Sequence, residues 1–435
     1  MKKRQGPNHR LRALLTEAGW TQEALARSVN ILGAEIGSTL RYDRTAVAHW
    51  LSGTQPRHPV PQLAAEALSR RIGRAITPEA AGFADVASEG PPIDPVTGFT
   101  ALCRSDADAA RRVPLHQRPY RVADAVVPHP PQGPARFRGL GQRAEETKAL
   151  HDAVEFFATS IDSHGGRHAR SALSAYLADD VVPLLGSRQT PRMRAELLVL
   201  ASRLAFLLAR MYEDGLLHGV AQRYYNYAQR LAGESGDRTA WSVVLRAMSA
   251  QAQRLGHLPS ALQLAEAAQQ GAHGAPPAHQ AYVGTQLAVV LARSGDRREA
   301  LAVLGRAERA AEQAGGAGAP FDSYPTAALH FQTAGVLEAL GDLPGALGAL
   351  RRSAVERSPS DLRGRALTQA RFGQLLLRAG RLDEACAAWS GFLDGRERLR
   401  SGDAEQALRA MRQALHPYRN RRQTAELLSR TPQGR

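Results

Sequence analysis

The sequence predicts an all-α protein with a small N-terminal helical domain, a linker rich in proline and glycine, and a long C-terminal part of repeated helical hairpins. Three observations favour this class. Apolar residues recur three and four positions apart along most of the chain, and a glycine-to-alanine phrase recurs four times in the second half. Between residues 141 and about 415, no strand-like alternation of apolar and polar residues stands out. A chain of 435 residues should divide into two or three domains.

We expect four helices in an N-terminal domain over residues 1–83. Gly19 ends the first helix and Thr21 caps the second, which extends to about residue 30. The third helix spans 44–51, with Asp43 as its N-cap and Gly53 after its end. A fourth amphipathic helix follows in 61–73.

The third helix belongs to the stretch RYDRTAVAHWLSGTQPR, residues 41–57. Its spacing turns one apolar face inward, made of Val47, Trp50 and Leu51. The outward positions are small or cationic and would fit an electronegative groove: Arg44, Thr45, Ala48 and His49.

Residues 84–140 read as a linker, because proline and glycine are frequent there and no helical period persists. Phe99, Tyr120 or Val126 are the side chains that would dock it locally. Residues 416–435 form a basic tail, for which two interpretations stay open: contacts to phosphates, or disorder.

Residues 141–415 are expected to be helical throughout, and their repeats begin at Gly256, Gly295, Gly341 and Gly380. Each glycine is followed five residues later by an alanine: Ala261, Ala300, Ala346 and Ala385. A tight turn before a helix with a small residue permits close packing, so we expect helical hairpins stacked side by side. A more degenerate copy starts at Asp214 and Gly215.

The formal net charge of +15 favours a polyanionic partner, although an arginine-rich genome would give the same charge without one. Between Met1 and Gly82, twelve lysines and arginines accompany six acidic residues. Cys103 and Cys386 lie too far apart in the sequence, in unlike contexts, to indicate a disulfide framework or a thiolate metal site, which fits a reducing cytoplasm. Without a signal-peptide core or an 18-residue apolar run, we expect a cytoplasmic protein with no membrane partner.

Signals for catalysis are poor in this sequence. Asp162, His164 and His168 in DSHGGRH are metal-ligand types, but no fourth ligand is evident, so we expect no metal site. The chain contains no GxxxxGK[ST] phosphate loop and no GxSxG elbow. We therefore expect no enzyme, no catalytic residue and no cofactor.

A tyrosine-rich stretch, QRYYNYAQR, occupies residues 222–230. Tyr224, Tyr225 and Tyr227 combine apolar area with a polar tip and could line a partner site, with Arg223 suited to an acidic peptide. Packing between helices explains the tyrosines equally well.

Two resemblances follow from these motifs. GWTQEALARSVN followed by DRTAVAHWLSGTQPR resembles the helix-turn-helix of lambda-repressor-like (Xre-type) DNA-binding domains, and the glycine-to-alanine phrases resemble tetratricopeptide repeats (TPR). Their order resembles actinobacterial regulators of development and antibiotic production. In such domains the second helix crosses the phosphate backbone and the third lies in the major groove. The segment ILGAEIGSTLRY departs from the usual turn of about four residues between these helices.

The resemblance implies a role for each matching residue in binding double-stranded DNA. Gln22 would bond a phosphate, and Arg41 and Arg57 would neutralise phosphates. Arg44 would bond guanine and Thr45 would touch a thymine methyl, with Ala48 and His49 also facing bases.

We therefore expect a sequence-specific transcriptional regulator, in line with control of development or secondary metabolism, that acts as a homodimer. Its TPR-like part would bind a peptide, protein or small-molecule effector and mediate self-association. Two alternatives remain: an adaptor that binds proteins and not DNA, or an N-terminal hairpin that only packs against the second half.

Overall fold

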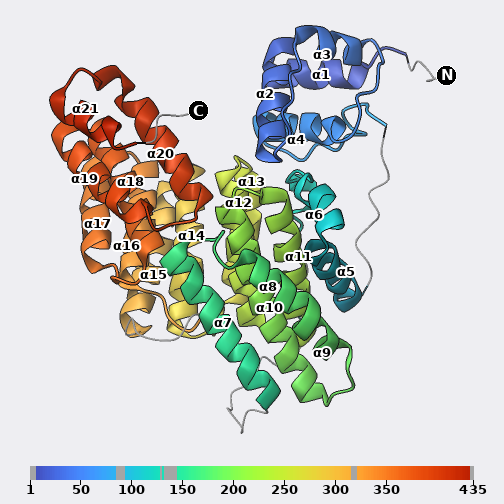
Figure 1. Ribbon diagram of the computed structural model, residues 1–435, viewed down its shortest axis with the longest axis vertical. Helices are drawn as coiled ribbons and strands as arrows, with labels where there is room; N and C mark the ends of the chain where they lie inside the picture. The colour runs from blue at the N-terminus through green and yellow to red at the C-terminus, as the bar shows by residue number, and fades with distance from the viewer. Residues whose placement is uncertain (1–5, 85–93, 128–129, 132–144, 315–320, 432–435) are drawn as a thin grey trace. The chain divides into compact units, whose positions relative to one another are not determined.

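The structure is a computed structural model that describes residues 6–84, 94–127, 130–131, 145–314 and 321–431 (Figure 1). Every regular element in these ranges is a helix, which confirms the all-α class. The chain forms two compact units. The first contains residues 1–136, 174–209 and 217–267, and the second contains 137–173, 210–216 and 268–435. None of the described helices has both the length and the apolar character needed to cross a bilayer.

Four helices form the N-terminal domain, and its core contains Leu11, Leu25, Val47 and Leu63, all completely buried. Gly19 ends the first helix with a left-handed φ of 62°, and the Thr21 hydroxyl accepts a hydrogen bond from the Ala24 amide. Both predicted boundaries are confirmed. The helices are α1 (His9–Ala18), α2 (Gln22–Glu35), α3 (Arg44–Leu51) and α4 (Val60–Ile72).

Helix α2 is longer than the sequence predicts, because residues 31–35 continue it instead of opening a loop. The connection to α3 is therefore residues 36–43. Asn30 on α2 holds this connection, since its side-chain amide donates to the Tyr42 carbonyl and accepts from the Tyr42 amide, both at 2.8 Å. The Tyr42 ring in turn packs edge-on against Trp50 of α3, with centroids 5.3 Å apart.

The segment predicted as a linker is largely helical where the structure describes it, and this differs from our expectation. It forms α5 (Pro95–Ala107), α6 (Ala109–His116) and the 3₁₀ turn η1 (Val122–Asp124). Asp94 caps α5 and Pro95 is its first residue, a position that tolerates proline. Phe99 and Tyr120 are buried, whereas Val126 is exposed.

The helical repeats follow the predicted phrase. Gly256, Gly295, Gly341 and Gly380 all have positive φ, and a helix starts two residues after each. The four alanines five residues after these glycines are completely buried, which confirms the turn and the close packing. The helices are α10 (Pro191–Asp214), α11 (His218–Ser235), α12 (Arg238–Arg254), α13 (Leu258–Gly271), α14 (Pro277–Arg293), α15 (Arg297–Ala314), α16 (Thr326–Ala339), α17 (Leu343–Glu356), α18 (Leu362–Arg378) and α19 (Leu382–Arg396).

Consecutive helices are paired by buried polar bonds as well as by apolar contact. A serine hydroxyl donates to a carbonyl of the partner helix in three pairs: Ser202 to Ala228, Ser249 to Ala261 and Ser353 to Ala327, each at 2.7 Å. These pairs are α10 with α11, α12 with α13, and α16 with α17. The part of the chain from α10 to α19 is thus a series of TPR-like helical hairpins.

The remaining helices flank the repeats: α7 (Glu145–His164), α8 (Arg170–Tyr176), the π-helix η2 (Leu177–Val181), α9 (Val182–Gly186), α20 (Gly402–Leu415), the 3₁₀ turn η3 (His416–Tyr418) and α21 (Arg422–Ser429). The expected basic tail therefore contains a helix, because Thr424 and Leu427 are buried against the second unit. In that unit, buried Asp214 accepts hydrogen bonds from Arg363 and Ser401.

Candidate nucleic-acid interface

Helix α3 presents two faces of opposite character. Val47, Trp50 and Leu51 are buried in the core of the domain. The outward residues Arg44, Thr45, Ala48 and His49 are all exposed. Asp43 caps the helix as predicted, with its carboxylate accepting from the Ala46 amide at 2.9 Å. Residues 44–51 therefore form a short helix, fixed at its start and along its inner side, whose outer face is small and cationic.

Exposed basic side chains surround α3. Arg41 and Arg57 flank the helix and are exposed, like Arg44 and His49. Within the described residues, none of these four side chains forms an ion pair. The charge of the three arginines is thus available to an external anion.

The arginines at the C-terminal end of α4 contrast with this group. Arg70 bonds the Glu35 carboxylate at 2.8 Å and the Glu66 carboxylate at 2.9 Å. Burial by itself would lower the pKa of Arg70, but the bonds and charges of these two carboxylates hold it above its ordinary value. Arg74 pairs with Glu17 at 2.7 Å. Arg70 and Arg74 are therefore neutralised by carboxylates, unlike the arginines around α3, whereas Arg71 between them donates to the Ala18 carbonyl at 2.9 Å.

Gln22, the other residue expected at DNA, is the first residue of α2 and is half-buried. Helices α2 and α3 are in contact with each other. Residues 36–43 between them are more numerous than in the motif the sequence resembles.

The structure does not place the tyrosines of α11 on an open surface. Tyr224, Tyr225 and Tyr227 are buried, and Arg223 is half-buried. The Tyr224 hydroxyl donates to the buried Asp106 carboxylate at 2.8 Å. Tyr227 packs against Phe99 of α5, and Tyr225 against Phe206 of α10. Helix packing is the interpretation that fits the tyrosines, because α5 and α6 cover the face on which a partner was expected.

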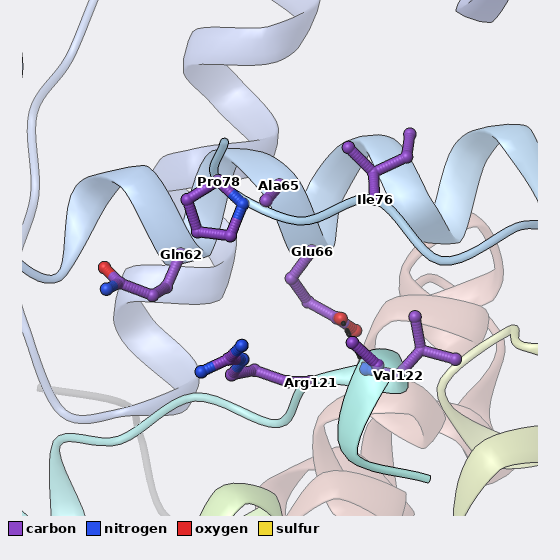
Figure 2. A pocket seen from close by; sticks show the side chains of 8 residues that line it. Gln62, Ala65, Glu66, Ile76, Pro78, Arg121 and Val122 are labelled. Carbon is purple, nitrogen blue, oxygen red and sulfur yellow. Dashed lines mark hydrogen bonds between the residues drawn. The ribbon is translucent and has the colours of Figure 1, made fainter. Parts of the chain in front are cut away.

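Sequence reasoning missed the polar groups that fix residues 118–124, here called the strap, to the rest of the first unit. Buried Glu66 on α4 bonds His257 Nε2 at 2.6 Å and accepts from the Val122 amide at 3.3 Å. Figure 2 shows the Glu66 carboxylate beside Val122, in a small pocket that Gln62 and Arg121 also line. The residue pairs in these contacts are far apart in sequence, and no local pattern signals them. The attachment uses α4 and leaves the outer face of α3 exposed.

The DSHGGRH stretch brings two imidazoles together. The His164 and His168 rings are exposed and have centroids 4.4 Å apart. Partial desolvation lowers the pKa of His168, and the neighbouring charges of His164 and Arg400 lower it further. In the ranges that the structure describes, no group of three or more histidine, cysteine, aspartate or glutamate side chains is arranged to hold a metal ion.

Comparison with known proteins gives one family match. The model of the SP15 N-terminal domain matches residues 11–84, a segment that contains most of α1 and all of α2, α3 and α4. Among solved structures, a crystal structure of yeast Tom70 is similar to the chain at 14% sequence identity and a TM-score of 0.33. That similarity covers 86% of this chain and 85% of Tom70. No curated protein matches the chain.

Proposed function

We propose that this chain is an interaction protein with two binding parts: TPR-like repeats that bind a protein partner, and an N-terminal domain that binds double-stranded DNA through α3. The two parts have different support. Stacked helical hairpins provide long surfaces suited to protein partners. A fold of this kind hosts many functions, however, so the repeats suggest a class of partner and no particular one.

The division of charge in the N-terminal domain is the observation that supports DNA binding. Arg70 and Arg74 are neutralised by carboxylates, while Arg41, Arg44 and Arg57 are exposed and lack an ion-pair partner among the described residues. Guanidinium groups bind phosphates and pair bidentately with guanine. Thr45 and Ala48 are small enough to let α3 approach the floor of a major groove.

Salt dependence tests this proposal with the full chain. Affinity for a labelled DNA duplex is measured by fluorescence anisotropy at several salt concentrations, because released counterions make true DNA binding weaken steeply as salt rises. We expect Arg41→Ala and Arg57→Ala each to lower the slope of log affinity against log salt by about 1. The matched control is Arg74→Ala, which removes the same charge from a paired site and should leave the slope unchanged.

If Arg74→Ala lowers the salt slope as much as the two variants do, the binding depends on the net charge of the chain and not on the α3 surface. The proposal then fails in its specific form. An absence of duplex binding by the wild-type chain at low salt would exclude it altogether.

We further propose that two copies act together. A single short helix reads few base pairs, and helix-turn-helix proteins ordinarily gain specificity by binding two half-sites one helical turn apart. Light scattering of the purified chain gives its mass in solution. A strict monomer that still binds a single half-site tightly would contradict this part of the proposal.

The second candidate is an adaptor whose partners are all proteins, with the α3 face docked on an acidic protein surface. The repeat architecture favours a protein partner directly, and unneutralised arginines suit carboxylates as well as phosphates. This candidate predicts that the chain shows no preference among DNA sequences. It also predicts that the Arg44→Ala variant no longer binds the protein partner. Transcriptional control, a cytoplasmic location and the absence of enzymatic activity remain parts of the proposal.

A further inference from the structure

The strap, residues 118–124, lies against helix α11 in the manner of a bound peptide. Arg121 has extended backbone angles, with φ −135° and ψ 117°, and the strap ends in the 3₁₀ turn Val122–Asp124. Gln222 of α11 holds its peptide units from both sides: its Oε1 accepts from the Arg121 amide at 3.0 Å, and its Nε2 donates to the Arg121 carbonyl at 2.7 Å. One turn further along, Asn226 donates to the Asp124 carbonyl at 3.3 Å.

The α11 surface is shaped for close approach of this backbone. A Cβ atom at Gly219 would lie 1.9 Å from the Arg118 carbonyl oxygen, so only glycine fits there while the strap is in place. Gly219, Gln222 and Asn226 are spaced three and four residues apart and therefore share one face of the helix. Bonds from this face go to main-chain atoms and do not depend on the side chain at position 121.

Side-chain selectivity comes from the alternate residues Tyr120 and Val122, which are both buried. Tyr120 stacks on His257, with centroids 5.5 Å apart and 23° between the rings, and Leu255 completes the apolar cluster. In an extended chain, residues two apart point to the same side. The site therefore accommodates an aromatic side chain and, two positions later, a branched aliphatic side chain.

We propose that the α11 face made by Gly219, Gln222 and Asn226 is a binding site for a peptide with this aromatic–any–aliphatic pattern, extended at its middle residue and turning after it. The strap occupies it in cis, and a partner segment of the same pattern binds by displacing the strap. A tethered occupant acts at an effective concentration near the millimolar range, so the intact chain resists weak competitors. This inference rests on the proposed interaction role of the repeats, and no step of its argument uses DNA binding.

The test uses a fluorescein-labelled synthetic peptide with the sequence of residues 116–126 and measures fluorescence anisotropy without DNA. Tyr120→Ala loosens the strap and does not alter α11. We expect this variant to bind the peptide at least tenfold more tightly than the wild-type chain. Adding Gln222→Ala should remove most of that gain, and so should replacing tyrosine by alanine in the peptide.

The proposal is overturned if folded Tyr120→Ala protein, checked by thermal melting, binds the peptide no better than wild type. It is also overturned if the tyrosine-free peptide binds equally well. Hydrogen exchange on the unaltered chain gives a second measurement that needs no variant. Excess peptide should speed exchange in 118–124 while α11 stays protected, and unchanged exchange in 118–124 would contradict displacement. Duplex DNA is absent from both assays, so the DNA-binding proposal can fail separately.

Discussion

At the scale of single residues, a few buried or half-buried polar side chains decide where larger parts of the chain lie. Asn30 fixes the connection before α3, Gln222 fixes the strap, and Asp214 joins Arg363 to Ser401 in the second unit. Each satisfies main-chain or charged groups that would be costly to bury alone. Such residues set the register of an element more than they add to net stability.

His218, at the start of α11, makes stability depend on pH. Burial lowers its pKa from 6.5 to about 3, and the positive charges of Arg254 and Arg70 add to the effect. Below pH 6.5 the unfolded chain therefore binds a proton at His218 that the folded chain does not bind. The contribution of this group to the free energy of unfolding is fully present above pH 6.5 and is lost as the pH falls toward 3.

We expect the wild-type chain to lose up to about 2 kcal/mol from this group between pH 7.5 and pH 5, and His218→Gln to lose correspondingly less. Urea unfolding at the two pH values measures the difference. His273→Gln, at an exposed histidine, is the control. Equal losses in wild type and His218→Gln would refute the assignment.

At the scale of helices, the glycine-to-alanine phrase shows how a short sequence pattern fixes a hairpin. The glycine takes a positive φ and the alanine lets two helices approach closely. Gly373 in α18 provides a second close approach, because a Cβ there would lie 2.8 Å from the indole ring of Trp389 in α19. The Trp389 indole N–H also donates to the Ala370 carbonyl of α18 at 3.1 Å.

Two glycine-to-alanine substitutions should therefore have opposite effects. Gly373→Ala forces a methyl group against Trp389 and should destabilise the second unit by about 1–3 kcal/mol. Gly348→Ala, in α17, places its new Cβ more than 4 Å from every atom beyond the neighbouring backbone of its own helix, and should stabilise the unit by about 0.5–1 kcal/mol through higher helix propensity. Thermal melts of both variants check this. Destabilisation by both, or by neither, would contradict the packing described.

The accuracy of sequence-based prediction follows the range of the interactions involved. The caps at Thr21 and Asp43 and the stops at Gly19 and Gly53 are local signals, so α3 and its two faces were predictable. Helix α5 was not predictable, because Pro95 and Gly98 are residue types that usually break helices. In the structure Pro95 is the first residue of the helix, and Gly98 permits close approach to Tyr227. The strap depends on pairs such as Arg121 with Gln222, about a hundred residues apart.

At the scale of the whole molecule, the chain combines two kinds of surface. The N-terminal domain attaches through α4 to the rest of the first unit, where Glu66 meets His257, and keeps the cationic face of α3 exposed. A partner that displaced the strap would also remove the Val122 amide from Glu66. Partner binding and the placement of α3 would then be energetically linked.

The most direct test of the central claim is selection from a random-sequence duplex library by the purified full-length chain at two salt concentrations. The Arg44→Ala/His49→Ala variant and the Arg74→Ala control are carried through the same selection. We predict that wild type and control enrich one recurrent sequence and that the double variant loses it while retaining bulk DNA at low salt. Equal enrichment in all three proteins, or no enrichment in any, would contradict sequence reading by α3 and favour the protein-binding adaptor.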